Sequence, residues 1–174
     1  MITFKFIHQL KLPEIDKLLE IVGDQENMKE IGNGLTWDKH KIIDLMNYSN
    51  YDYKNKFKDS LFLFLVMFDD NKMVGIGYIH PGIYEFKKCC VQVAVLIDKK
   101  YRKKGYGNLL QKELLKMNDK YLHKPILSLV KIENKASNML FKKYKMKGQI
   151  LVNGHKYNVY QNLIIIPELF TIFS

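Results

Sequence analysis

The residues with the clearest chemical meaning are the basic and glycine residues of KKYRKKGYGN, Lys99 to Asn108. Five of the six positions from Lys99 to Lys104 carry Lys or Arg, and Gly105 and Gly107 follow. An apolar run precedes this stretch and an amphipathic segment follows it, so a strand leads into a helix here. The first turn of a helix exposes unpaired N–H groups and a partial positive charge, and glycine lets a ligand approach the main chain. The pattern therefore predicts a binding site for a phosphate or a diphosphate.

The spacing of the glycines distinguishes between kinds of phosphate-binding turn. A nucleotide-hydrolase loop would end in Gly-Lys-Ser or Gly-Lys-Thr, and GYGNLL does not. A dinucleotide-binding fold would have a third glycine at Leu110 and would place the turn after the first strand. RKKGYG, Arg102 to Gly107, instead fits the pattern Arg/Gln-x-x-Gly-x-Gly/Ala.

With this motif the chain resembles the GNAT superfamily of N-acetyltransferases, in which the turn binds the pyrophosphate of acetyl-coenzyme A. A second stretch, LSLVKIENKASNMLFKKY, is similar to the next strand and helix of the family, where N-x-x-A-x-x-x-Y is usual. Asn134 matches the Asn, Ser137 replaces the small residue, and Phe141 stands at the position of the tyrosine. The resemblance covers Cys89 to Met146. It implies a GNAT-like α/β fold, with a central twisted sheet of about seven strands flanked by about four helices.

The resemblance also implies binding roles. Val95 to Ile97 would offer backbone groups to the pantetheine arm, and Arg102 to Asn108 would hold the pyrophosphate through main-chain N–H groups. Asn134 would approach the pantetheine or the adenosine, and Phe141 would lie near the thioester sulfur. The residues implied to bind acetyl-coenzyme A (acetyl-CoA) are Val95, Leu96, Ile97, Arg102, Lys103, Lys104, Gly105, Tyr106, Gly107, Asn108, Asn134 and Phe141. No metal site is expected.

Acetyl transfer to an amine needs a base for the amine and an acid for the leaving thiolate. A lysine-like amine has a pKa of about 10.4, so a base or a water chain must remove its proton at neutral pH. Family members often use a tyrosine on the last helix as the acid. Tyr144 is the nearest hydroxyl to Phe141 in the sequence, and it is either that acid or a packed tyrosine. Glu133 and Glu85 are candidate bases or solvated carboxylates, and His80 is a candidate base or a structural residue before a turn.

The acceptor is expected to enter opposite the cofactor, over the segment between the first helix and the first hairpin. Trp37, Tyr48, Tyr51 and Tyr53 are concentrated there, and they either line a pocket or pack in the core. The formal net charge is +10, which either attracts an anionic partner or reflects a lysine-rich solvated surface. A basic surface suits an acidic acceptor or a protein tail flanked by carboxylates.

The elements that must position these residues follow from hydrophobic periodicity and turn signals. Strands are expected at 1–8, 61–68, 73–80, 89–97, 125–131, 147–152 and 157–166, and helices at 13–22, in a broken region at 24–48, at 106–117 and from 134. Residues 47–60 are interpreted as a polar, aromatic loop, DDNK as a hairpin turn, and Asn153-Gly154 as a two-residue hairpin turn. Cys89 to Lys131 forms a strand-helix-strand unit whose two strands should be parallel. The order indicates one mixed α/β (α+β) domain over residues 1–174.

Composition narrows the class of protein. The hydrophobic fraction of 47% allows a sizeable core. The longest apolar runs are too short to span a bilayer, the first residues lack the pattern of a signal peptide, and Cys89 and Cys90 are adjacent in a strand. We therefore expect a cytoplasmic protein without disulfides or membrane spans. The apolar tail, Ile164 to Ser174, would cover a sheet edge or form a homodimer.

Three functional hypotheses stay open. The first is an acetyl-CoA-dependent N-acetyltransferase that acts on a primary amine of a small molecule or a protein. The second is a catalytically silent acyl-CoA-binding regulatory protein, which Phe141 and the lack of a carboxylate in strand 89–97 favour. The third is a nucleic-acid-binding domain that uses KKYRKK as a phosphate-tracking patch, which leaves the two glycines without a role.

Overall fold

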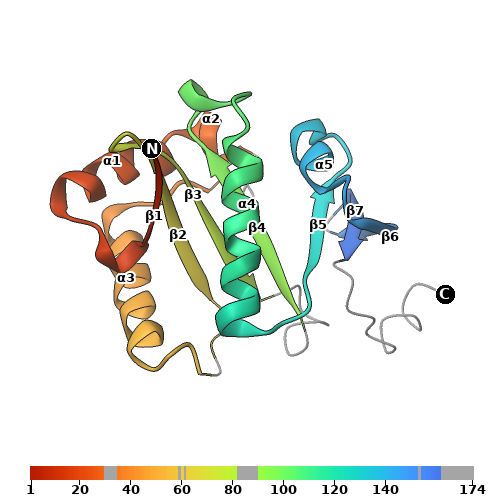
Figure 1. Ribbon diagram of the computed structural model, residues 1–174. Coiled ribbons are helices and arrows are strands. Elements are labelled where there is room, and N and C mark those ends of the chain that lie inside the picture. The colour runs from red at the N-terminus through yellow and green to blue at the C-terminus, as the bar shows by residue number, and fades with distance from the viewer. Residues whose placement is uncertain (30–34, 59, 61, 82–89, 153, 162–174) are drawn as a thin grey trace. The chain divides into compact units, whose positions relative to one another are not determined.

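The computed structural model describes residues 1–29, 35–58, 60, 62–81, 90–152 and 154–161 (Figure 1). Its strands are β1 (Ile2–Phe6), β2 (Leu63–Asp69), β3 (Lys72–Pro81), β4 (Val91–Ile97), β5 (Leu127–Lys131), β6 (Lys145–Val152) and β7 (His155–Gln161), and its helices are α1 (Leu12–Val22), α2 (Gln25–Met28), α3 (Lys39–Lys54), α4 (Tyr106–Met117) and α5 (Lys135–Phe141). The predicted mixed α/β fold with about seven strands is confirmed, and in the described residues the strands divide between two sheets. Among these residues, no helix combines the length and the apolar run that a membrane crossing requires.

The chain groups into two compact units, and the first holds Met1–Ile79 and Ala94–His123. Its sheet has the strand order β1-β2-β3-β4. Strands β1 and β2 are antiparallel, and so are β2 and β3. The β2–β3 hairpin turns at Asp70 and Asn71, whose φ angles are 45° and 64°. The hairpin turn predicted from DDNK is confirmed.

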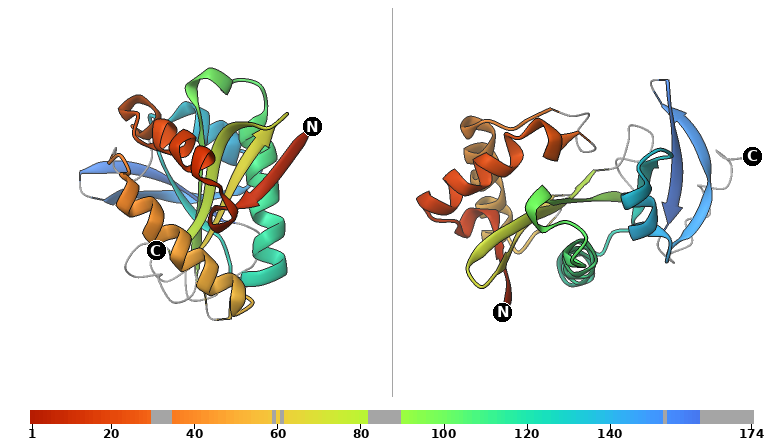
Figure 2. Two further views of the ribbon diagram at one scale, coloured as in Figure 1. Left: turned by 90° about the vertical axis from the view of Figure 1, so that its left-hand side faces the viewer. Right: turned by 90° about the horizontal axis from the view of Figure 1, so that it is seen from above.

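The first unit buries apolar side chains on both faces of its sheet. Helices α1 to α3 cover one face and α4 covers the other (Figure 2). Strand β2 lies between them, and every residue from Leu63 to Phe68 is buried. This explains why the strand reads as a continuous apolar run rather than an alternating one. On the side of α1 to α3, Leu18, Ile42 and Val66 belong to one buried cluster.

The second unit holds His80–Val93 and Lys124–Ser174. Its sheet has the order β5-β7-β6, and both pairs of strands are antiparallel. Val152 pairs with His155 across the β6–β7 hairpin, so a two-residue turn joins these strands. This confirms the hairpin predicted from Asn153-Gly154, although Asn153 itself lies outside the described residues.

Strands β4 and β5 are related by one isolated parallel bridge, between Val91 and Ile126. There the Val91 N–H group donates to the Pro125 carbonyl at 2.9 Å. The parallel direction predicted for the strand-helix-strand unit is confirmed at this pair.

A polar network holds α5 on β5 and β7. The side-chain amide of Asn138 donates to the carbonyls of Lys131 and Asn134, each at 2.8 Å. Its oxygen accepts from the Asn158 amide at 2.7 Å and from the Tyr160 hydroxyl at 2.8 Å. Because one side chain bonds to β5, to β7 and to the cap of its own helix, α5 is fixed relative to its sheet.

Helix α3 corrects the expectation of a loop at 47–60, because it continues to Lys54. The carboxylate of Asp38 caps its start by accepting from the Lys41 N–H group at 2.8 Å. The Asn, Ser, Asp and Tyr residues in its second half have low helix propensity. Ile42, Ser49 and Asp52 are nevertheless buried, so packing of one face outweighs that propensity.

Candidate cofactor site

The basic stretch begins where β4 ends, at Asp98. Asp98 is 4% exposed, and its N–H group donates to the Val74 carbonyl at 3.0 Å, which ties this point to β3. Its carbonyl accepts from the Tyr101 N–H group at 2.8 Å, and its carboxylate accepts from the Lys100 N–H group at 3.3 Å. These bonds close a 3-10 turn over Lys99–Tyr101 and fix the direction in which the chain leaves the sheet.

Two residues of the turn have a left-handed backbone conformation. The φ angle is 63° at Lys103 and 84° at Gly105. Gly105 is the N-cap of α4, and a Cβ built there would meet nothing within 4 Å. Glycine is therefore favoured at this position by conformation and not by lack of space. Turns of this kind direct neighbouring N–H groups towards one side and form anion-binding concavities.

The N–H groups of residues 103–107 are the unpaired donors of the turn. Asn108 and Leu109 donate to the Gly105 carbonyl at 3.1 and 3.3 Å, which begins α4. The N–H groups of 103–107 donate no hydrogen bond within the described part of the chain. The N-terminus of this 12-residue helix adds a partial positive charge. Asn108, by contrast, has its N–H group paired inside the helix, so that group is not free for a ligand.

The basic side chains of the turn divide into two groups. Lys99 forms ion pairs within the protein, and Arg102 donates from Nε to the Ile97 carbonyl at 3.1 Å. Lys100, Lys103 and Lys104 are exposed and form no ion pair with any residue the structure describes. Lys103 and Lys104 belong to the segment with the unpaired N–H groups, so their charge is available to an anion there.

Helix α4 is placed by contacts at its first turn and at its middle. The Tyr106 hydroxyl donates to Asp69 Oδ2 at 2.5 Å, and this bond holds the pKa of Asp69 below its ordinary value. Leu110 and Leu114 are fully buried above β3, where a Cβ on Gly77 would lie 2.7 Å from Leu114 Cδ1 and 3.0 Å from Leu110 Cγ. The helix thus lies closer to β3 than a side chain at position 77 would allow, and this sets the position of its N-terminal donors.

Residues 95–97, which are predicted to offer backbone groups to the pantetheine arm, form the last part of β4. Leu96 is buried, and Val95 and Ile97 are half-buried. A Cβ on Gly75 would lie 2.3 Å from the Leu96 carbonyl oxygen. The end of β4, like α4, therefore depends on a glycine of β3 for its position.

Two predicted binding residues, Asn134 and Phe141, belong to the second unit. The side-chain oxygen of Asn134 accepts from the Ser137 N–H group at 3.0 Å, so the predicted cap of α5 is confirmed. Phe141 is buried, and its ring stacks on Tyr160 with centroids 5.8 Å apart. Their contacts with a cofactor stay predictions.

Tyr144 is the strongest of the predicted catalytic residues. It lies between α5 and β6, its hydroxyl is buried without a hydrogen-bond partner in the described residues, and burial raises its pKa to about 12. Buried polar groups without partners are uncommon in proteins. The candidate bases have different surroundings. Glu133 is exposed beside the cap of α5, and His80 lies in β3, where burial lowers its pKa. Glu85 lies outside the described residues.

The aromatic residues predicted near an acceptor lie on α3 or just before it. Trp37 packs against Tyr78 with ring centroids 5.6 Å apart and contacts the core, as the packing alternative predicts. Tyr48, Tyr51 and Tyr53 are 52%, 67% and 45% exposed. The exposed face of α3 therefore presents phenol rings to solvent.

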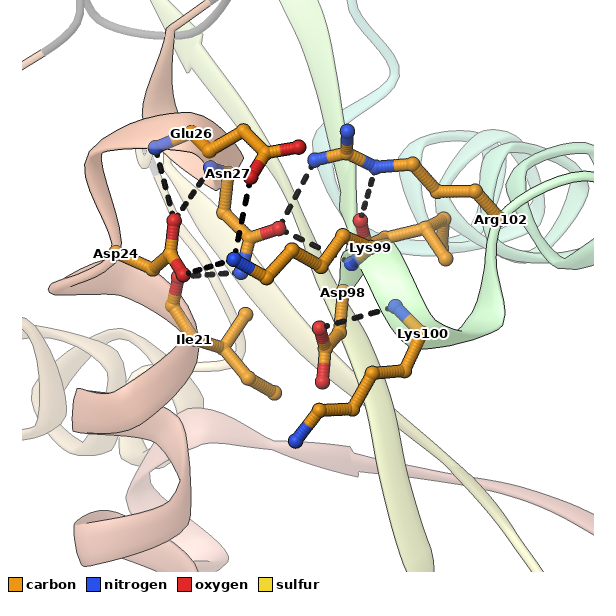
Figure 3. Close-up of polar contacts among 9 residues, drawn as sticks. Ile21, Asp24, Glu26, Asn27, Asp98, Lys99, Lys100 and Arg102 are labelled. Atoms are coloured by element: carbon orange, nitrogen blue, oxygen red, sulfur yellow. Dashed lines mark hydrogen bonds and ion pairs between the residues drawn. The ribbon is translucent and has the colours of Figure 1, made fainter.

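Asn27 contacts the turn although the sequence did not predict it. It lies in α2 and is 4% exposed. Its side-chain oxygen accepts from Arg102 Nη2 at 2.9 Å and from the Lys99 N–H group at 3.0 Å (Figure 3). These partners are 75 and 72 positions away in the sequence, and no local pattern of residues signals such a pair.

The fold is similar to those of solved N-acetyltransferases. A ribosomal-protein-alanine N-acetyltransferase from Brucella melitensis has a TM-score of 0.69 at 17% identity, over 93% of this chain and 99% of that one. The protein yncA from Salmonella typhimurium, whose structure holds acetyl-CoA, has a TM-score of 0.67 at 15% identity, over 93% of each chain. A spermidine N-acetyltransferase from Vibrio cholerae, in complex with CoA and spermine, has a TM-score of 0.65 at 15% identity, over 92% of each chain. At these identities the likeness shows the fold.

Sequence comparison identifies the family. No curated protein matches the chain. The sequence model described as the acetyltransferase (GNAT) family matches residues 34–145, which is more than half of the 174 residues. The matched segment includes the turn at 102–107, Asn134 and Phe141. The chain therefore belongs to the GNAT acetyltransferase family.

Proposed function

We propose that this protein is an N-acetyltransferase that transfers the acetyl group of acetyl-CoA to a primary amine. The observation that carries the proposal is the set of N–H groups of residues 103–107, which are unpaired in the described chain at the start of α4. The open space around Gly105 and the exposed Lys103 and Lys104 add room and positive charge. These features fit a diphosphate, which needs several donors and compensating charge. Acetyl-CoA supplies the diphosphate and, at its other end, the acetyl thioester.

Tyr144 is proposed as the donor to the leaving sulfur. Its pKa of about 12 keeps the hydroxyl protonated at neutral pH, and it has no partner in the described chain to compete with the sulfur. A thiol has a pKa of about 8.5 and is a stronger acid than this phenol, so complete proton transfer would be uphill. Tyr144 therefore contributes a hydrogen bond that stabilises the thiolate as it forms.

Glu133 is proposed to help remove the proton of the amine. It is exposed at the start of α5, and a carboxylate there can pass a proton to solvent. An exposed carboxylate is also well hydrated, and water can take over part of its role. Replacement of Glu133 by Gln is thus expected to slow the reaction less than replacement of Tyr144 by Phe.

The net charge of +10 influences which charge the acceptor is expected to carry. A strongly basic protein repels a polycation at long range and attracts an acidic molecule. One neighbour is named for the alanine of a ribosomal protein and another for spermidine. Of these two kinds of amine, we propose that a protein amine flanked by carboxylates suits this chain better than a polyamine.

Two measurements test the proposed function. Isothermal titration with acetyl-CoA should give saturable binding, and release of free thiol should accompany mixing with an amine acceptor. The acceptor panel should include acidic peptides with a free N-terminus, a lysine peptide and spermidine. Absence of binding to acetyl-CoA would reject the proposal. Binding without thiol release across the panel would favour the catalytically silent module, and salt-sensitive DNA binding that survives saturating CoA would favour a nucleic-acid-binding domain.

A further inference from the structure

The side-chain amide of Asn27 joins three segments of the first unit (Figure 3). Its nitrogen donates to the Ile21 carbonyl in α1 at 3.1 Å. Its oxygen accepts from the Lys99 N–H group at 3.0 Å and from Arg102 Nη2 at 2.9 Å. Because the side chain is 4% exposed, water cannot readily replace these partners. One buried amide thus links α1, α2 and the turn that follows β4.

Helix α2 depends on such contacts for its order. It has only four residues, too few to be stable by itself. The Asp24 carboxylate caps it by accepting from the N–H groups of Glu26 and Asn27 at 2.8 and 3.1 Å. Lys99 Nζ pairs with Asp24 at 2.8 Å and with Glu26 at 3.2 Å. The helix and the turn therefore hold each other in place.

Arg102 uses its guanidinium group inside the protein. Nε donates to the Ile97 carbonyl at 3.1 Å, and Nη2 donates to Asn27. These bonds hold residue 102 in an extended conformation, with φ −63° and ψ 160°, directly before the left-handed Lys103. The first residue of the motif thus determines where the chain turns, and its side chain points to α2 (Figure 3).

We propose that Asn27 is a positioning residue for the anion-binding turn, and that it couples the order of α2 to occupancy of the turn. The Asn27 oxygen fixes Lys99 and Arg102, which fix the conformation from which the N–H groups of 103–107 are presented. A diphosphate that holds the turn in this conformation therefore also stabilises α2. The identity of the ligand rests on the proposed function, whereas the link between Asn27 and the turn does not.

Titration of acetyl-CoA into four variants tests the binding part. Asn27→Leu keeps the size of the side chain and removes its hydrogen bonds, Arg102→Lys keeps the charge, and Arg102→Met removes it. Each is expected to weaken binding about tenfold, the effect of roughly one positioning hydrogen bond. The double variant Asn27→Leu/Arg102→Met should weaken binding by less than the product of the two single effects, because both single variants lose the same contact between Asn27 and Arg102. Gln25→Ala, at an exposed position of the same helix, is the control and should bind like the wild type.

Two results would overturn this part. Wild-type affinity in Asn27→Leu would mean that the turn does not depend on the amide. Wild-type affinity in Arg102→Lys together with weak binding in Arg102→Met would mean that the charge of Arg102 acts on the anion directly. Thermal unfolding of each variant shows whether it is folded, and Arg102→Lys leaves the proposal testable if Asn27→Leu is not.

Amide hydrogen exchange tests the coupling and separates it from the proposed function. In the free protein, Asn27→Leu should speed exchange of the Lys99 N–H group, which loses its acceptor. With acetyl-CoA, exchange should slow in the wild type at residues 25–28 as well as at 103–107, and Asn27→Leu should abolish the effect at 25–28. If the wild type binds no acetyl-CoA, the proposed function fails, and the Lys99 exchange still decides the role of Asn27. Unchanged exchange at Lys99 in the variant overturns the proposal.

Discussion

Replacement of Gly105 by alanine separates the conformational need for glycine from the need for a ligand contact. Gly105 has φ 84° and ψ −5°, and an L residue in this left-handed region costs about 1–2 kcal/mol. A Cβ at this position meets nothing within 4 Å, so no steric clash adds to that cost. We expect Gly105→Ala to remain folded and to lower the free energy of unfolding by about 1–2 kcal/mol.

The effect of Gly105→Ala on acetyl-CoA binding should be larger than its effect on stability suggests. A free turn can relieve part of the strain by relaxing, whereas a bound diphosphate requires the left-handed conformation. In the proposed binding mode, the new methyl group also stands where the anion approaches the main chain. Only the strain that the free turn relieves must be restored on binding, so this contribution is at most about 1–2 kcal/mol and raises the Kd by up to about 5- to 30-fold, and the methyl contact adds to this. Isothermal titration measures the change.

Gly154→Ala is the matched control for this experiment. Gly154 has φ 77°, and a Cβ there also meets nothing within 4 Å. It lies in the β6–β7 hairpin, which carries none of the predicted binding residues. Urea unfolding should show similar stability losses for the two variants, and only Gly105→Ala should lose affinity. Equal, wild-type affinity in both variants would refute binding of the diphosphate by the main chain of the turn.

Three further predictions concern titration and catalysis. Burial, with a smaller contribution from the charge of Lys54, lowers the pKa of His8, so the folded protein resists protonation of this side chain. Urea unfolding should therefore show a free energy of unfolding that falls as the pH drops below about 6.5. His8→Gln should flatten this dependence, and an unchanged profile would contradict the assignment. Tyr106→Phe should raise the pKa of Asp69 towards its ordinary value, because the phenol no longer donates to the carboxylate, and carboxyl NMR titration of both proteins checks the shift. Tyr144→Phe should lower kcat on the order of a hundredfold. The Kd for acetyl-CoA and the unfolding midpoint should stay at their wild-type values, because the lost hydroxyl is buried without a partner in the described chain. A wild-type kcat would remove Tyr144 from the mechanism.

The conformation of the turn at residues 102–107 could be predicted because its determinants are local. Arg102 to Gly107 are consecutive, and the left-handed conformation of Gly105 and the start of α4 follow from residue types within a few positions. The strands follow in the same way from alternating or continuous apolar patterns, and the β6–β7 hairpin follows from Asn153-Gly154. For these parts, neighbouring residues carry the physical cause of the structure.

The features that the sequence did not reveal depend on distant partners. Helix α3 continues to Lys54 because one face is buried against the core, although its residue types favour a loop. The motif suggests that Arg102 lends its charge to an anion, but its guanidinium group bonds to Asn27, 75 positions earlier. The hydroxyl of Tyr144, which is buried without a partner among the described residues, likewise results from tertiary packing. Periodicity and turn chemistry contain no information on such pairs.

The lack of a side chain at Gly77 influences the distance between α4 and β3, and with it the position of the N–H groups at the start of α4. Leu110 and Leu114 rest on this point of β3, and the donors belong to the first turn of the same rigid helix. A substitution within the turn alters the donors one at a time. A methyl group at position 77 would instead press on the side chains of Leu110 and Leu114, and any movement of the helix that follows would shift all the donors together. The affinity proposed for the turn is thus expected to depend on a residue of β3 that lies beneath the helix.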